Sequence, residues 1–121
     1  MISTADATDL RNAALRALAD PTRARIVELL ADRPRTASEL HAAFPIVAPA
    51  VSRHLRVLRE AGLVEERRPE RHRRVRLYGL RPEPVREVAG WLDGLRRGEP
   101  SPLEAFADHV ALRTDRPRGA P

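Results

Sequence analysis

Residues 47–62 constrain the fold more than any other stretch, because their apolar and polar side chains separate cleanly at helical spacing. Val51, Leu55 and Leu58 recur on one side, so this face is expected to be buried. Proline suits a first helical turn and glycine the position after a helix, so the segment is predicted to be one complete helix. The opposite face, with two arginines on one outward line, carries Pro49, Arg53, Arg56 and Glu60, with Ser52 on its flank.

A hairpin with a basic tip is predicted directly after this helix. Residues 63–68 and 75–80 have the composition of strands, and residues 69–73 between them have turn chemistry. The second strand alternates, and its polar face is expected to carry Arg74, Arg76 and Tyr78. Positions 67–76 hold six arginines, more than a soluble loop requires. The side chains expected to meet a phosphate backbone are Arg68, Arg71, His72, Arg73 and Arg74.

Taken alone, the helix fits two interpretations, an ordinary surface helix with a solvated polar face or a DNA-reading helix. The hairpin favours the second, because a helix that presents arginines and is followed by a basic hairpin is the layout of a winged helix. We therefore predict a mainly α fold with a small β-hairpin, a winged helix-turn-helix. Its helix would enter the major groove through Pro49, Ser52, Arg53 and Arg56.

The placement of the positive charges is more informative than their number. The chain carries a formal net charge of +5, and all 22 of its Lys and Arg residues are arginine. Arginine suits phosphates and guanine edges, yet a GC-rich bacterial genome also produces an arginine bias whatever the function. The clustering of arginines on one helix face and one hairpin therefore carries the prediction.

Several function classes are disfavoured by what the sequence lacks. None of its 121 residues is cysteine, which removes disulfides, thiolate metal sites and cysteine nucleophiles. The first residues do not resemble a signal peptide, and no apolar stretch is long enough to span a bilayer. No catalytic constellation appears. We expect a cytoplasmic protein that makes no membrane contact, is not an enzyme and needs no cofactor.

Further helices are expected to surround the winged unit. Residues 1–7 are predicted to be disordered, and a helix from about Thr8 carries apolar residues on two sides. Asp20 is expected to cap a second helix, which ends before Pro34. Thr36, with a glutamate three residues later, fits a capping box that opens a third helix.

The domain boundaries follow from these elements. Residues 8–97 are predicted to form one DNA-binding and dimerisation domain. A C-terminal helix is expected over residues 98–113, and a disordered tail rich in proline and glycine over residues 114–121.

Dimerisation is predicted because the first helix and the helix after the hairpin carry more apolar surface than one small core can use. The second of these helices, over residues 85–97, contains the single tryptophan. The predicted interface residues are Leu10, Leu15, Val88, Trp91, Leu92 and Leu95.

Two stretches, residues 18–26 (LADPTRARI) and residues 50–64 (AVSRHLRVLREAGLV), resemble the opening and recognition-helix signatures of the ArsR/SmtB-type bacterial transcriptional regulators. The likeness covers about residues 10–97. It implies a homodimeric winged-helix regulator whose first helix and post-wing helix form the interface. Family members are mostly repressors that leave DNA when a signal arrives.

The chain departs from this family in two respects. Family members commonly place a small polar cap on the recognition helix and a glycine in the preceding turn, where this chain has Val47-Ala48 and residues 44–46, Phe-Pro-Ile. Loss of the cap costs on the order of 1 kcal/mol and removes a polar contact near the groove. Sequence preference is therefore expected to depend on Ser52, Arg53 and Arg56. The cysteine-bearing metal motif of many family sensors is absent.

Three hypotheses therefore stand. The first is a dimeric, sequence-specific DNA-binding regulator, expected to repress transcription from a double-stranded operator. The second is a sensor of a divalent metal or small molecule that uses ligands other than cysteine. Its only metal-ligand candidates, Asp93, Asp108 and His109, lack the paired spacing of a site, so no metal is favoured. The third is a winged-helix module that binds an acidic protein partner through its basic hairpin.

Overall fold

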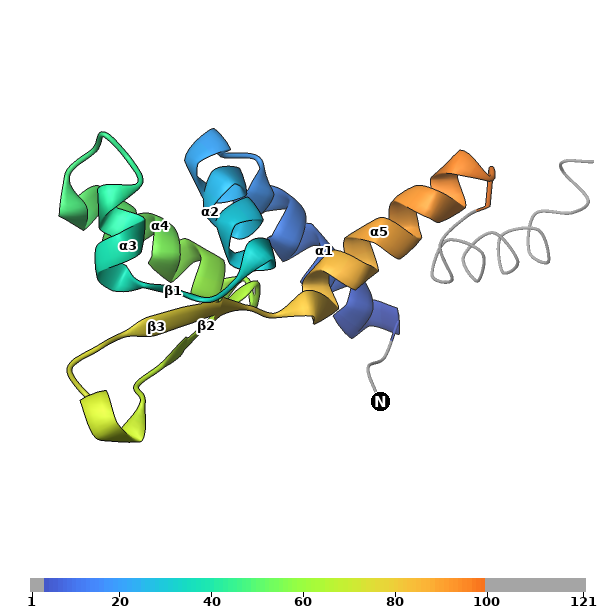
Figure 1. Cartoon of the computed structure of the whole chain (residues 1–121). Coiled ribbons are helices and arrows are strands. Elements are labelled where there is room, and N and C mark those ends of the chain that lie inside the picture. The colour runs from blue at the N-terminus through green and yellow to red at the C-terminus, as the bar shows by residue number, and fades with distance from the viewer. Residues whose placement is uncertain (1–3, 100–121) are drawn as a thin grey trace, which may run out of the picture.

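The α-helices lie on one side of a three-stranded antiparallel sheet in the computed structural model, which describes residues 4–99 (Figure 1). In chain order the elements are α1 (Thr4–Leu18), α2 (Pro21–Asp32), β1 (Arg35–Thr36), α3 (Ala37–Ala42), α4 (Ala48–Glu60), β2 (Val64–Arg67), the 3-10 helix η1 (Glu70–His72), β3 (Leu77–Leu80) and α5 (Pro82–Arg96). This architecture confirms the predicted winged helix-turn-helix fold, with α3 and α4 as the helix pair and β2–β3 as the wing. No helix within the described residues has both the length and the apolar composition needed to cross a bilayer.

The sheet contains one strand that the sequence pattern did not reveal. β3 is its centre, pairing with β2 so that Val64 faces Leu80, and with β1 so that Arg35 faces Tyr78. β1 is two residues long, which is too short to show any alternation of polar and apolar side chains. Its pairing with β3 connects the α2–α3 segment to the start of this wing strand.

The core confirms the predicted face of α4 and corrects the predicted face of β3. Val51 and Leu58 are fully buried, and Leu55 is 2% exposed. Tyr78, predicted on the polar face with the arginines, is only 3% exposed, whereas Leu77 is half-buried. Alternation separates the two faces of a strand but does not say which is covered, and in the folded chain the covered face of β3 is the one that holds Tyr78.

The helix starts agree only partly with the predicted caps. The capping box at α3 is confirmed, since the Glu39 N–H donates to Thr36 Oγ1 over 3.1 Å and the Thr36 N–H donates to Glu39 Oε1 over 3.0 Å. These bonds, together with Arg33, lower the pKa of Glu39. Asp20 occupies the N-cap position of α2 but makes no side-chain cap, which corrects the prediction. α1 begins at Thr4 rather than near Thr8, so the predicted disorder of residues 1–7 is wrong for residues 4–7.

α5 lies beside α1 and extends beyond the rest of the fold at the end opposite the wing (Figure 1). The guanidinium carbon of Arg11 lies 4.5 Å from the centroid of the Trp91 ring, a cation–π contact between the two helices. Leu92 and Leu95 are 51% and 47% exposed. Val88, predicted at a dimer interface, is instead 9% exposed and belongs to the protomer core. The helix predicted over residues 98–113 and the tail fall almost wholly outside the described residues, as do the metal candidates Asp108 and His109.

Candidate nucleic-acid interface

The outward face of α4 presents two exposed arginines. Arg53 and Arg56 lie opposite the buried row of this helix, and Pro49 is exposed in its first turn. No ion pair within residues 4–99 involves either arginine, so both guanidinium groups keep their donors for an external acceptor. The helix ends where Gly62, with a φ of 77°, takes the left-handed conformation that glycine favours.

Ser52 lies beside this face rather than on it. Its hydroxyl oxygen lies 3.5 Å from Nε2 of His41 on α3, at the limit of a hydrogen bond, and the residue is half-buried. Ser52 therefore links the two helices of the helix-turn-helix pair.

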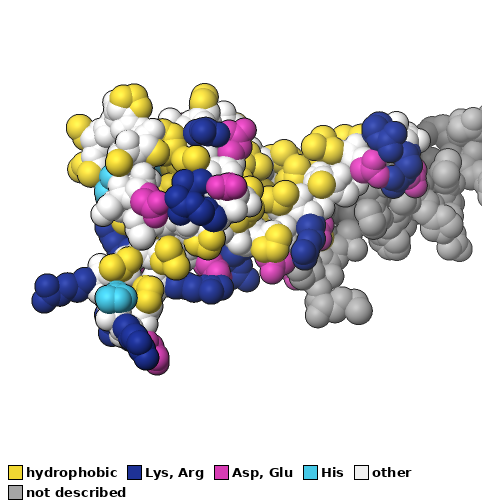
Figure 2. Space-filling model, viewed as in Figure 1, with side chains coloured by type: hydrophobic (Ala, Val, Ile, Leu, Met, Phe, Trp, Pro, Cys, Tyr) yellow, Lys and Arg dark blue, Asp and Glu magenta, His cyan; other side chains and the backbone are white. Residues whose placement is uncertain are grey.

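The wing tip is an ordered turn with a basic surface (Figure 2). The His72 N–H donates to the Pro69 carbonyl over 3.0 Å, and the Val75 N–H donates to the His72 carbonyl over 2.9 Å. These bonds hold four exposed side chains at the tip, Arg71, His72, Arg73 and Arg74. Within residues 4–99 no carboxylate pairs with any of them, which is the arrangement that phosphate contact requires.

Arg68 differs from its neighbours because its guanidinium contacts other residues of the hairpin. Its Nη1 donates to the Arg73 carbonyl over 3.1 Å, and its Nη2 lies 3.6 Å from Oε1 of Glu66. The structure thus gives Arg68 a bracing role that the sequence pattern did not indicate.

Glu66 joins the wing to α4. Its side chain is 14% exposed, and its Oε2 lies 3.0 Å from Nη1 of Arg59 at the end of α4, while Arg68 approaches its other oxygen. Tyr78 faces Glu66 across the hairpin, where burial and then the nearby carboxylate raise the pKa of the phenol. The Arg59–Glu66 pair could not be predicted from spacing, because its members lie on different elements.

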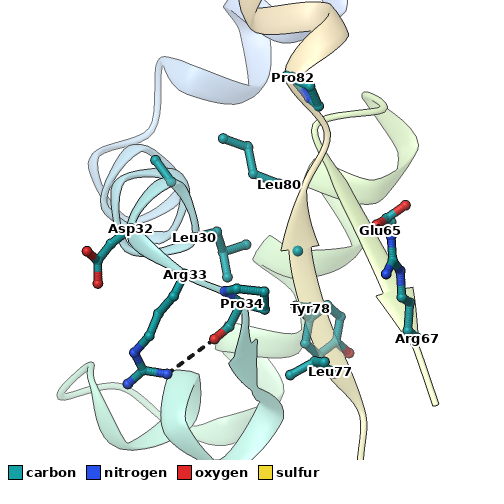
Figure 3. A pocket seen from close by; sticks show the side chains of 12 residues that line it. Leu30, Asp32, Arg33, Pro34, Glu65, Arg67, Leu77, Tyr78, Leu80 and Pro82 are labelled. Carbon is teal, nitrogen blue, oxygen red and sulfur yellow. Dashed lines mark hydrogen bonds and ion pairs between the residues drawn. The ribbon is translucent and has the colours of Figure 1, made fainter. Parts of the chain in front are cut away.

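Among the grooves that border the wing within residues 4–99, two differ in their free charge. One, of about 290 Å³, separates α3 from the wing and is lined by Thr36, Ala37, Ser38, His41, Arg74, Val75 and Arg76. Its hydroxyl and guanidinium donors extend the basic surface, and Ser38 and His41 on α3 were not predicted because no charge pattern marks them in the sequence. The other, of about 400 Å³, lies between the end of α2 and β3 (Figure 3). Its charged side chains are already paired, Arg67 with Glu65 and Arg33 with Glu39, so it adds no free charge.

Comparison with known proteins agrees with this geometry. Residues 20–66 match the family model described as bacterial regulatory protein, arsR family. The arsenic resistance transcriptional regulator ArsR1 of Pseudomonas putida is 35% identical over 97 residues, which cover 79% of this chain and 70% of that protein. The chain belongs to the arsR family. The members of this family are transcriptional regulators and not enzymes.

Two further relatives support the membership of this arsR-family protein. An HTH-type transcriptional regulator of Mycobacterium tuberculosis is 51% identical over 69 residues, which cover 57% of this chain and only 62% of that protein. A crystal structure of an ArsR family transcriptional regulator superposes with a TM-score of 0.66 at 31% identity, covering 73% of this chain and 93% of that one. The winged helix-turn-helix is thus the fold of a solved relative.

His54 and Asp93 of this arsR-family protein both lie close to arginines. Nδ1 of His54 lies 3.5 Å from Nη1 of Arg23 and 3.9 Å from Oδ2 of Asp20, so His54 is packed against residues of the same protomer. Asp93 pairs with Arg96 over 2.8 Å and also with Arg97. Residues 4–99 contain no group of three or more His, Cys, Asp or Glu side chains that could hold a metal ion.

Proposed function

We propose that this arsR-family protein is a homodimeric, sequence-specific DNA-binding regulator that represses transcription in the bacterial cytoplasm. The observation that carries this proposal is the set of unpaired arginines on α4 and on the wing tip, two elements joined through Glu66. A module that docks on an acidic protein through its wing would not need Arg53 and Arg56 on the helix as well.

The two elements meet different parts of DNA in this proposal. An α-helix fits the major groove, where the guanidinium of Arg53 or Arg56 can donate two hydrogen bonds to a guanine. The wing-tip arginines meet phosphates, whose contacts add affinity without sequence information and release counterions. The Arg59–Glu66 pair holds the helix and the wing in one fixed relation.

The exposed face of α5 supports dimerisation. Leu92 and Leu95 are exposed, and the other predicted interface residues Leu10, Leu15 and Trp91 are half-buried. Nε1 of Trp91 is buried without an acceptor within the described part of the chain. A second copy packed on α1 and α5 would cover this apolar surface, and the two α4 helices would address half-sites about 34 Å apart. A dimer bound across a promoter would block RNA polymerase, and transcription would therefore be repressed.

Operator selection tests the proposal. The full chain is incubated with random duplex DNA, the bound sequences are amplified, and affinities for the selected and a scrambled duplex are measured at several salt concentrations. We expect a two-fold symmetric site bound at least about 10³ times more tightly than the scrambled duplex. Sequence-indifferent, salt-labile binding to both would contradict the proposal and favour the protein-docking module.

A further inference from the structure

The α3–α4 connection and the first turn of α4 form an exposed apolar surface. Residues 42–51 contain no polar side chain. Within them Ile46 is 39% exposed and Val47 is 68% exposed, the highest fraction among the large exposed hydrophobic residues of the described chain. Figure 2 shows hydrophobic side chains gathered over this end of the molecule. Exposed apolar area of this kind gains free energy when a partner covers it.

The stability of the protomer does not explain Val47. It occupies the N-cap position of α4 with an extended backbone, and it makes no side-chain cap. Serine, threonine, aspartate or asparagine at this position would bond a free N–H of the first turn, which valine cannot do. Val47 is also too exposed to contribute to the core. Its role therefore lies in contact with something outside the protomer.

The neighbouring side chains indicate the chemistry of that partner. Pro49 is exposed in the turn that follows Val47, and Arg53 and Arg56 are exposed farther along α4, where both arginines are unpaired within residues 4–99. A partner that fits this face carries negative charge around an apolar feature. The DNA major groove has this character, because phosphates border it and the 5-methyl group of thymine is the apolar group on its floor.

We infer that Val47, supported by Ile46, contacts thymine methyl groups of the operator and is a specificity-determining residue. The inference rests on the proposed function, and it follows from the geometry of helix-turn-helix docking, in which N-terminal residues of the recognition helix contact base edges. The entrance of α4 then recognises thymine by apolar contact, whereas Arg53 and Arg56 recognise bases by hydrogen bonds.

Replacement of thymine by deoxyuridine tests this contact, because uracil keeps every hydrogen-bonding group and lacks only the methyl. Each thymine of the selected operator is replaced in turn. At one or two positions per half-site we expect about a fourfold loss of affinity, the value of one buried methyl group. Val47→Ser removes both methyl groups of the side chain and supplies a capping oxygen, so α4 is retained. This variant should bind the thymine operator less tightly and show no difference between thymine and uracil.

Val57→Ser is the matched control, since Val57 is also an exposed valine of α4, 37% exposed, but lies far from the entrance of this helix. It should keep the wild-type difference between thymine and uracil. Indifference of the wild type to uracil at every position, with the operator still bound specifically, would overturn the inference and leave the proposed function intact. An equal response to uracil in Val47→Ser and wild type would also overturn it. Failure to select any operator would instead contradict the proposed function.

Discussion

Arg56 is the side chain whose removal best separates base recognition from general affinity. Its guanidinium is exposed on the outward face of α4 and unpaired within residues 4–99. Arg56→Ala should therefore weaken binding to the selected operator by about 1–3 kcal/mol, with a much smaller loss on scrambled DNA. Fluorescence anisotropy titrations on both duplexes measure the two losses.

Arg86→Ala is the control for this substitution. Arg86 is also an exposed arginine without an ion pair in the described chain, but it lies on α5, away from α4 and the wing. Its removal lowers the net charge by the same amount, so equal effects of the two substitutions would mean that Arg56 acts only through its charge.

The contact between α4 and the wing can be followed through the absorbance of Tyr78, which faces Glu66. Tyr78 is the only tyrosine of the chain, so absorbance titration follows this phenol alone. Burial, followed by the carboxylate of Glu66, raises its pKa. Glu66→Gln should lower that pKa while leaving it above the ordinary value, because burial remains. Glu65→Gln should leave the titration unchanged, since Glu65 pairs with Arg67 and not with this group.

The same shift gives a pH dependence of stability. A phenol whose folded pKa is raised stabilises the fold fully below its unfolded pKa, near 10, and loses this contribution as pH rises through the folded pKa. Stability measured by denaturant at pH 9 and above should therefore fall less steeply in Glu66→Gln than in wild type.

Elements with strong periodicity were predictable, and those fixed by contacts between segments were not. The buried row of Val51, Leu55 and Leu58 repeats every three or four residues, so α4 and its outward arginines followed from spacing alone. β1 and the inward face of Tyr78 depend on what packs on β3. The missing cap at Val47 could be read from the sequence, whereas the contacts of Arg68 required the folded hairpin.

At the scale of the whole molecule, the apolar face of α5 is expected to hold the dimer together. Leu92→Glu combined with Leu95→Glu places two carboxylates on exposed positions, so each protomer should stay folded while the dimer dissociates. Sedimentation at tens of micromolar should give a dimer for wild type and a monomer for the variant.

Arg86→Glu, about half a turn around α5 from Leu95, is the control and should remain dimeric. The monomeric variant should also lose most of its preference for two half-sites over one. Sedimentation of the wild-type protein as a monomer would contradict the proposed homodimer.

Helix α4 is expected to contact bases and the wing tip to contact phosphates, and affinity measured against salt concentration separates these two contributions. Wild type, Arg56→Ala and the double variant Arg71→Ala with Arg73→Ala are compared on operator and scrambled DNA. The wing variant should weaken binding to both duplexes alike and lower the salt-dependence slope by about two, one for each lost phosphate contact. Arg56→Ala should reduce the preference for the operator and leave the slope nearly unchanged. Loss of sequence preference in the wing variant, with only a changed slope in Arg56→Ala, would contradict the account.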